Sequence, residues 1–194
     1  GVPGEAQPHV RARYVSGYPF HDRDVVVVGG KNSAAEAALD LYRHGARVTL
    51  VVRAPALSDR VKYWIKPDLE NRIKEGSIRA FFNTVVERIT ERSVLVRTAE
   101  GTQELANDWV LAMTGYHPDY VFLEGLGIRI DDDVYRTPIV DEASFESSRP
   151  GLYLAGTVCG GYLTNRWFIE NGRFHARQIA KHISSGRAER VRFE

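Results

Sequence analysis

The sequence is poor in cysteine, in long apolar runs and in excess charge, and each shortage excludes a class of protein. Cys159 is the only cysteine among 194 residues, so the chain holds no internal disulfide, Cys-x-x-Cys redox pair or cysteine-based zinc site. Lys and Arg number 26 against 25 Asp and Glu, a balance that attracts neither nucleic acid nor an anionic membrane. The apolar runs are far shorter than the roughly 20 residues of a membrane helix, and no basic-then-apolar leader opens the chain. We therefore expect a cytoplasmic protein without a nucleic-acid or membrane partner.

The composition is that of a folded protein of one domain, or of one domain and part of another. Hydrophobic residues make up 43% of the chain and charged residues 26%, which is enough to form a buried core. The chain opens on Gly1 rather than Met, and we interpret it as a fragment of a longer protein. Residues 1–23 contain scattered prolines and glycines and show no sustained period, which predicts an irregular lead-in.

Residues 24–52 predict a strand, a helix and a second strand in succession. A continuous valine run at residues 25–28, closed by glycines, is typical of a strand buried on both faces of a parallel sheet. Small and apolar residues then recur at helical spacing up to Gly45, which is a typical helix stop. A second β-rich run at residues 47–52 completes the unit.

The rest of the chain continues as a mixture of strands and helices. Pro67 marks the first turn of one helix, and Thr164 is the expected N-cap of the last helix. The expected helices are residues 67–75, 119–126 and 164–183, and the expected strands are residues 78–82, 85–90, 93–98, 102–105, 109–113 and 152–155. The three strands between residues 85 and 105 are separated by short turns, which predicts an antiparallel meander.

The turn after the first strand has most features of a dinucleotide-binding turn. Its residues are Gly29, Gly30, Lys31, Asn32, Ser33 and Ala34. In the pattern Gly-x-Gly-x-x-Gly/Ala, Gly29 permits the tight turn and Ala34 lets the helix pack closely on the strand. The helix N-terminus offers N–H groups to a pyrophosphate. Lys31 replaces the middle glycine, so it either points away from the phosphate or supplies its own charge to it.

Basic residues after the second strand favour NADP over NAD. An acidic residue at this strand end would bind the ribose 2′-hydroxyl of NAD, but this strand ends at Arg53, which can bind a 2′-phosphate instead. Ser58, Arg60 and Lys62 follow in the same loop and add to a cationic site. The sequence thus predicts NADPH as the nucleotide.

The order of these motifs resembles the NADPH domain of thioredoxin-reductase-like flavoproteins that bind two dinucleotides. Residues 2–5 resemble the segment that leads into the NADPH domain, Thr114 and Gly115 the crossing back to the flavin domain, and residues 151–156 the last flavin-domain strand. Several segments resemble the bacillithiol-disulfide-reductase branch in particular: residues 29–34, 61–64, 71–76, 115–119 and 168–174.

The resemblance implies an α/β fold, a domain plan and a function. It implies a lead-in at residues 1–23, a Rossmann-like NADPH-binding domain at 24–113, and the C-terminal part of an FAD-binding domain at 114–194. Cofactor contacts are implied at Thr114 and Gly115, and at Gly156 and Thr157, where the family usually has an Asp in place of Thr157. The implied reaction passes electrons from NADPH through FAD to a low-molecular-weight disulfide such as bacillithiol disulfide.

Two expected family features are absent from the sequence. The N-terminal FAD fingerprint has no counterpart, so the resemblance places FAD in the full-length parent and predicts an inactive chain when these residues stand alone. Residues 9–23 contain no Cys-x-x-Cys, which excludes a thioredoxin reductase. The segment is interpreted as the C-terminal three-fifths of such an enzyme.

No single residue is assigned a catalytic role. Cys159 is interpreted as a small apolar filler, because no second thiol accompanies it. His175 is interpreted as a packing or surface residue, and His117 is not expected to donate a proton to the cofactor. Gly172 interrupts a helix and predicts that some group approaches the backbone closely there.

Other classes of protein remain as alternatives. No tyrosine has a lysine four positions later, which excludes a short-chain dehydrogenase. A non-catalytic NADP(H)-binding module and a flavin-containing monooxygenase-like enzyme both stay open. The sequence does not fix the electron acceptor or the oligomeric state, and it is compatible with a homo-oligomer.

Overall fold

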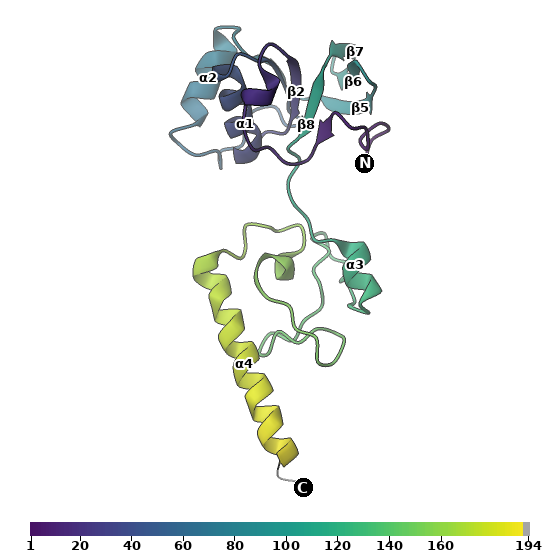
Figure 1. Ribbon diagram of the computed structural model, residues 1–194, viewed down its shortest axis with the longest axis vertical. Helices are drawn as coiled ribbons and strands as arrows, with labels where there is room; N and C mark the ends of the chain where they lie inside the picture. The colour runs from purple at the N-terminus through teal and green to yellow at the C-terminus, as the bar shows by residue number, and fades with distance from the viewer. Residues whose placement is uncertain (192–194) are drawn as a thin grey trace. The chain divides into compact units, whose positions relative to one another are not determined.

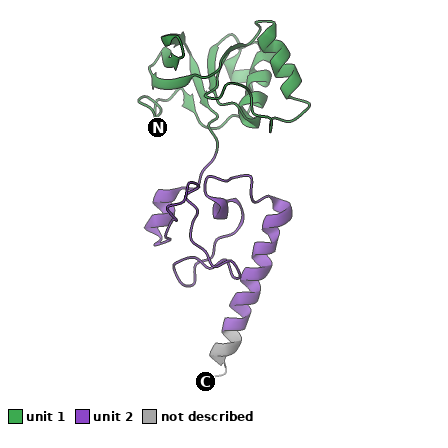
Figure 2. Ribbon diagram, turned by 180° about the vertical axis from the view of Figure 1, so that it is seen from behind, with its two compact units in different colours: residues 1–115 green, residues 116–194 purple. Residues whose placement is uncertain are grey.

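The computed structural model describes residues 1–191, which fold into two compact units. Unit 1 is Gly1–Gly115 and unit 2 is Tyr116–Glu194, coloured green and purple in Figure 2. Unit 1 contains the strands and two helices, whereas unit 2 is built mostly of loops around two helices (Figure 1).

A five-stranded parallel sheet forms the centre of unit 1. Its strands, in spatial order, are β1 (Val10–Arg11), β8 (Trp109–Ala112), β2 (Asp24–Val28), β3 (Arg47–Val51) and β4 (Arg79–Phe81). Every neighbouring pair is parallel. The apolar run that makes β2 is buried because this strand has partners on both sides, β8 and β3.

Helices cover one face of the sheet. Helix α1 (Asn32–Arg43) buries four alanines and two leucines, and these small side chains let it pack closely on β2 and β3. Helix α2 (Lys66–Lys74) begins with a proline near its N-terminus and adds Leu69 to the same core. The short helix η1 (Tyr18–Phe20) adds Phe20 to this core.

An antiparallel meander packs against the other side of the central sheet. Its strands are β5 (Val85–Ile89), β6 (Ser93–Thr98) and β7 (Gly101–Ala106), in that spatial order. A second apolar cluster joins Val26 and Val110 of the parallel sheet to Val94 and Val96 of the meander. The parallel sheet is thereby buried on both faces.

Unit 2 contains helix α3 (Tyr120–Gly125), the short helix η2 (Gly156–Gly160) and helix α4 (Ile169–Val191). Asp119 caps α3 by accepting a 3.0 Å hydrogen bond from the N–H of Phe122. Between the helices, the described residues form isolated β-bridges only. The core of this unit is small and consists of Leu123, Ile128, Phe145, Leu154 and Cys159, with partly buried neighbours.

The structure confirms the α/β fold class and corrects three local predictions. Residues 152–155 form no strand; Tyr153 makes a single bridge to Glu146, because the described part of unit 2 contains no strand ladder that could extend it. Thr164 does not cap the last helix, which starts at Ile169. At the start of this helix, Oδ1 of Asn171 accepts a 2.6 Å hydrogen bond from the N–H of Phe168.

The third correction concerns the expected irregular lead-in. Part of it is strand β1, which pairs with β8 and so belongs to the central sheet. The Tyr14 hydroxyl also donates a hydrogen bond to Asp40 of α1. The weak sequence period missed this strand because β1 is only two residues long.

Gly172 lies where the backbone of α4 approaches another segment closely. A Cβ at Gly172 would lie 3.6 Å from Cα of Gly156, at the start of η2. The expected close approach is therefore found inside unit 2, and its partner is the backbone of a second glycine.

Candidate functional site

The turn between β2 and α1 is held in a conformation that requires glycine. Gly29 has φ +145°, and a Cβ there would collide with the carbonyl oxygen of Met113 and lie 3.0 Å from Cβ of Ala34. The chain can therefore bring the end of β2, the end of β8 and the first turn of α1 together only when residue 29 has no side chain. At Gly30 a Cβ would lie 2.7 Å from Cγ1 of Val52.

The N-terminus of α1 presents unpaired N–H groups at this turn. Lys31 is the exposed N-cap residue, its backbone is extended, and it forms no side-chain cap hydrogen bond. The first helical bond runs from the N–H of Ala35 to the carbonyl of Lys31, 3.0 Å apart. The preceding helical N–H groups therefore have no partner within the helix, and they carry the positive end of its dipole, which suits a phosphate.

Asn32 joins the turn to the loop that carries the basic residues. Its Nδ2 donates to the carbonyl of Arg60 at 3.0 Å, and its Oδ1 accepts from the N–H of Lys62 at 2.9 Å. A third bond, 2.9 Å long, connects the N–H of Ser58 to the carbonyl of Gly30. The sequence predicts a cofactor contact at Asn32; both ends of its side-chain amide are bound to this loop, so the amide positions the loop.

The predicted basic residues differ in their surroundings. Arg53 is exposed directly after β3 and Val52, and its side chain forms no hydrogen bond or ion pair with the described residues. Lys62, in contrast, pairs with Glu36 of α1 at 2.6 Å and lies 5.7 Å from the centre of the Trp64 ring. The Oγ of Ser58 accepts a 3.2 Å hydrogen bond from the N–H of Arg60. The guanidinium of Arg60 is likewise exposed and has no hydrogen bond or ion pair with the described residues. Arg53 and Arg60 are thus the available cations of this loop, while the charge of Lys62 is offset by a carboxylate.

Thr114 and Gly115 follow β8 at the same edge of the parallel sheet. Both are exposed, and Gly115 has φ +106°. Since Met113 is in contact range of Gly29, the two residues stand next to the nucleotide turn. They are also the last residues of unit 1.

Gly156 and Thr157 turn their polar groups toward the protein. The N–H of Gly156 donates to Nδ1 of His175 at 3.1 Å, and the hydroxyl of Thr157 donates to the carbonyl of Trp167 at 3.4 Å. These groups stabilise the junction between η2 and α4. In this arrangement the N–H of Gly156 and the hydroxyl hydrogen of Thr157 are both donated within unit 2.

His175 is a packing residue, as the sequence predicted. It is 1% exposed, stacks on Phe145 with ring centres 3.9 Å apart, and meets Trp167 edge to face. Burial lowers the pKa of its imidazole, because removing water penalises the charged form. His175 is therefore neutral near pH 7 and braces η2 against α4. His117 lies exposed, with Nδ1 2.8 Å from the carbonyl of Pro118.

Cys159 is an apolar filler in the core of unit 2. It is 4% exposed and packs within the cluster that contains Phe145 and Leu154. Burial raises the pKa of its thiol to about 11. The thiol is protonated at neutral pH and is a poor nucleophile there.

The described residues show neither a metal-binding cluster nor a membrane-spanning helix. Among the side chains that the structure describes, residues 1–186, there is no group of three or more His, Cys, Asp or Glu arranged to hold a metal ion. In the same part of the chain, the helices are too short or too polar to cross a membrane.

Comparison with known proteins identifies close relatives. Residues 1–156 match the family model described as pyridine nucleotide-disulphide oxidoreductase. The chain is 45% identical over 185 residues to bacilliredoxin reductase Bdr of Bacillus subtilis (strain 168), a match that covers 95% of this chain and 57% of that protein. The chain thus spans little more than half the length of this relative.

Solved structures give the same picture. Bacillithiol disulfide reductase Bdr (YpdA) from Bacillus cereus is 41% identical, with a TM-score of 0.88 over 95% of this chain and 57% of that one. Lactococcus lactis thioredoxin reductase is 25% identical, with a TM-score of 0.70 over 95% of this chain and 60% of that one. The fold predicted from the resemblance is therefore confirmed.

Removing the Asn32 amide should release the loop at residues 60–62. In Asn32→Ala both side-chain hydrogen bonds are lost, so we expect the amide of Lys62 to exchange its hydrogen faster, by a local opening free energy of about 1 kcal/mol. Asn32→Asp retains the acceptor for the N–H of Lys62, so its exchange rate at Lys62 should lie between those of the unmodified chain and Asn32→Ala. Hydrogen exchange followed by NMR measures this, with Ser33→Ala as the exposed control. Unchanged protection of the Lys62 amide in Asn32→Ala would contradict the role of Asn32 in holding this loop.

Cys159 should resist alkylation while the protein is folded. With its thiol pKa at about 11, the folded protein should react slowly with iodoacetamide at pH 8, and the unfolded chain, with a thiol pKa near the ordinary ~8.5, should react quickly. Because the folded pKa is the higher one, this thiol's contribution to stability is present below pH ~8.5 and is lost as the pH rises toward 11. Mass spectrometry counts the modified thiols, and rapid labelling of the folded protein at pH 8 would refute the assignment.

Proposed function

Because the chain belongs to the pyridine nucleotide-disulphide oxidoreductase family, we propose that residues 29–34 bind NADPH for an FAD-dependent disulfide reductase. The proposed substrate is a low-molecular-weight disulfide such as bacillithiol disulfide, and the proposed location is the cytoplasm. The observation that carries the proposal is the turn at Gly29, which has no room for a side chain and leads into unpaired helix N–H groups. The name of the Bacillus cereus relative, bacillithiol disulfide reductase, supports the choice of substrate.

The residues of unit 1 have distinct tasks in this proposal. The N–H groups at the start of α1 bind the pyrophosphate, and Lys31 adds a positive charge beside them. Arg53 binds the 2′-phosphate and so selects NADPH over NADH. Asn32 fixes the loop that follows Arg53, and Thr114 and Gly115 border the nucleotide where β8 ends.

The flavin site is not completed by residues 1–191. FAD supplies the relay that accepts a hydride from NADPH and passes two electrons to a disulfide. Within the described residues, the turn at 29–34 is the one glycine-rich turn that follows a strand and opens a helix, and it is assigned to NADPH. Gly156 and Thr157 are already bound to His175 and Trp167, so we assign them to the structural support of a flavin domain.

We assign residues 114–194 to the C-terminal portion of that flavin domain. The described part of unit 2 has a small core and no strand ladder. Large apolar side chains at the start of α4 are exposed, with Phe168 57% and Ile169 86% accessible. A unit that leaves such residues in water is typical of one that packs against further structure.

The nucleotide preference depends on Arg53. We expect NADPH to bind more tightly than NADH, and Arg53→Ala to weaken NADPH by roughly ten- to a hundredfold, the scale of one charge-assisted hydrogen bond, while NADH is nearly unaffected. Calorimetric titration of both nucleotides measures the effect. Arg88→Ala, an exposed arginine on β5, is the matched control. Equal losses for the two nucleotides would disprove the role of Arg53.

The chain of residues 1–194 alone should hold no stoichiometric FAD and reduce no disulfide, because it offers no second pyrophosphate-binding turn in its described part. The gene product that contains this chain should be yellow and should oxidise NADPH with bacillithiol disulfide. The visible spectrum and the loss of NADPH absorbance measure both. A flavin band near one equivalent in the chain alone would contradict the incomplete site, and a colourless gene product would support a non-catalytic module.

A further inference from the structure

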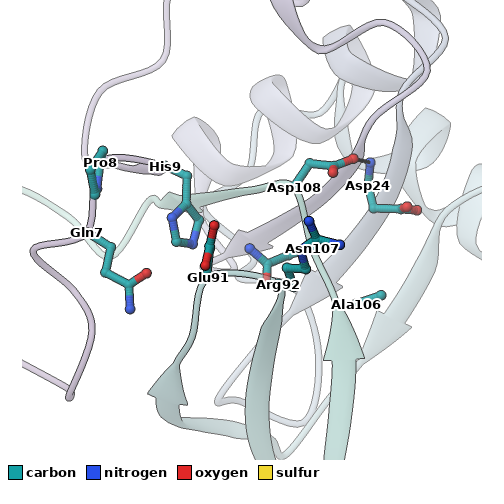
Figure 3. Close-up of a pocket in the computed structure, with 9 residues that line it drawn as sticks. All are labelled: Gln7, Pro8, His9, Asp24, Glu91, Arg92, Ala106, Asn107 and Asp108. Carbon is teal, nitrogen blue, oxygen red and sulfur yellow. Dashed lines mark hydrogen bonds between the residues drawn. The ribbon is translucent and has the colours of Figure 1, made fainter.

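A cavity lies in unit 1 at the amino edge of the parallel sheet. Its volume is about 740 Å³, within the ~300–1,000 Å³ range of small-molecule sites. The residues that line it come from four segments, as Figure 3 shows, and the polar ones are Gln7, His9, Asp24, Glu91, Arg92, Asn107 and Asp108. His9, Asp24 and Asp108 each stand at or just before the start of a parallel strand.

This cavity is separate from the proposed nucleotide site. The turn at Gly29 follows the carboxyl end of β2, whereas Asp24 is the first residue of the same strand. Five strand residues at about 3.3 Å each place the two sites about 16 Å apart. A ligand bound at one edge of the sheet therefore does not occupy the other.

The side chain of Asn107 is buried at this cavity without partners. Asn107 is 4% exposed, and its Oδ1 and Nδ2 both lack a hydrogen-bond partner in the described structure. Its backbone is fixed, since its N–H donates to the carbonyl of Arg92 at 3.0 Å. An unpaired buried donor or acceptor costs about 1–3 kcal/mol, so an amide with both ends unpaired is expensive unless something binds it.

The other polar groups of the cavity indicate what can bind. Nε2 of His9 is also buried without a partner in the described structure, and Figure 3 shows the ring beside Glu91. The carboxylate of Asp24 is paired with Arg47 at 2.9 Å. That leaves two carboxylates, Glu91 and Asp108, against one guanidinium, Arg92, a balance that disfavours a phosphate.

We propose that this cavity binds a small uncharged molecule whose amide-type edge, with a hydrogen-bond donor next to an acceptor, pairs with both ends of the Asn107 side chain. Nucleobases and primary carboxamides present this edge, and an asparagine amide pairs with it through two parallel hydrogen bonds. The adjoining Arg92 side chain is exposed and forms no hydrogen bond or ion pair with the described residues, so no polar contact fixes its position beside the amide.

The probes are chosen so that only the edge differs within a pair. Cytidine represents the nucleobases and benzamide the carboxamides. Pyrimidin-2-one riboside and acetophenone are their analogues without the amino group. NMR titration of the ¹⁵N-labelled chain should show saturable shifts of the Asn107 side-chain amide with cytidine, benzamide or both, and at least tenfold weaker binding of the matching analogue. Neither probe saturating, or each analogue binding as well as its parent, would overturn the proposal.

Variants locate the site independently of the shifts. Asn107→Leu removes both unpaired polar atoms without emptying the space, so it should fold and should weaken the bound probe at least tenfold. Asn71→Leu, an exposed asparagine on α2, is the matched control and should bind the probe as the unmodified chain does. NADPH affinity should be unchanged in both variants. Probe binding that survives Asn107→Leu would refute the role of Asn107.

Discussion

The close approach of Gly29 to Met113 is the constraint on which the site in unit 1 depends. A side chain at residue 29 would collide with the carbonyl oxygen of Met113, so its absence lets the ends of β2 and β8 converge. Helix α1 can then start directly above the sheet edge, with Ala34 packed against the turn. The parallel strands bring the helix N–H groups, the strand end at Arg53 and the segment after β8 to one edge, and the close approach at Gly29 draws the ends of β2 and β8 together there.

Hydrogen bonds from that turn hold the loop after β3 in position. Asn32 binds the backbone at Arg60 and Lys62, and Gly30 binds the backbone at Ser58. Each bond joins residues about thirty positions apart in the sequence. Gly30 and Asn32, the earlier partners, belong to the turn, so the turn determines their positions. The loop therefore inherits its position from the constraint at Gly29.

The sequence predicted the parts of this arrangement that arise from local patterns. Strand β2 was found from its continuous valine run, the turn from its glycines, and the meander strand β6 from its alternation of buried and more exposed residues. The sequence did not predict the hydrogen bonds of the Asn32 amide or the ion pair between Lys62 and Glu36, because both join side chains to groups on another segment. Such partners are fixed by the tertiary structure, and one sequence carries no local signal for them.

In unit 2, a local sequence pattern predicted a strand that does not form. Residues 152–155 have the composition of a buried strand, and Leu154 is indeed buried, yet the segment pairs through one bridge only. A strand pattern reports that a segment suits a sheet, but the ladder also needs a neighbouring strand. The burial of Leu154 beside Phe145 and Cys159 shows that apolar packing persists where strand pairing does not.

The two edges of the parallel sheet must recognise ligands by different means. At the carboxyl edge, α1 begins, and its unpaired N–H groups favour an anion whatever side chains surround them. At the amino edge, the strands begin after loops, so any ligand there is recognised by side chains such as Asn107 and His9. A sheet whose carboxyl edge suits phosphates can thus carry at its amino edge a site for an uncharged ligand. The separation follows from strand direction, because every parallel strand has its helix-bearing end on the same side.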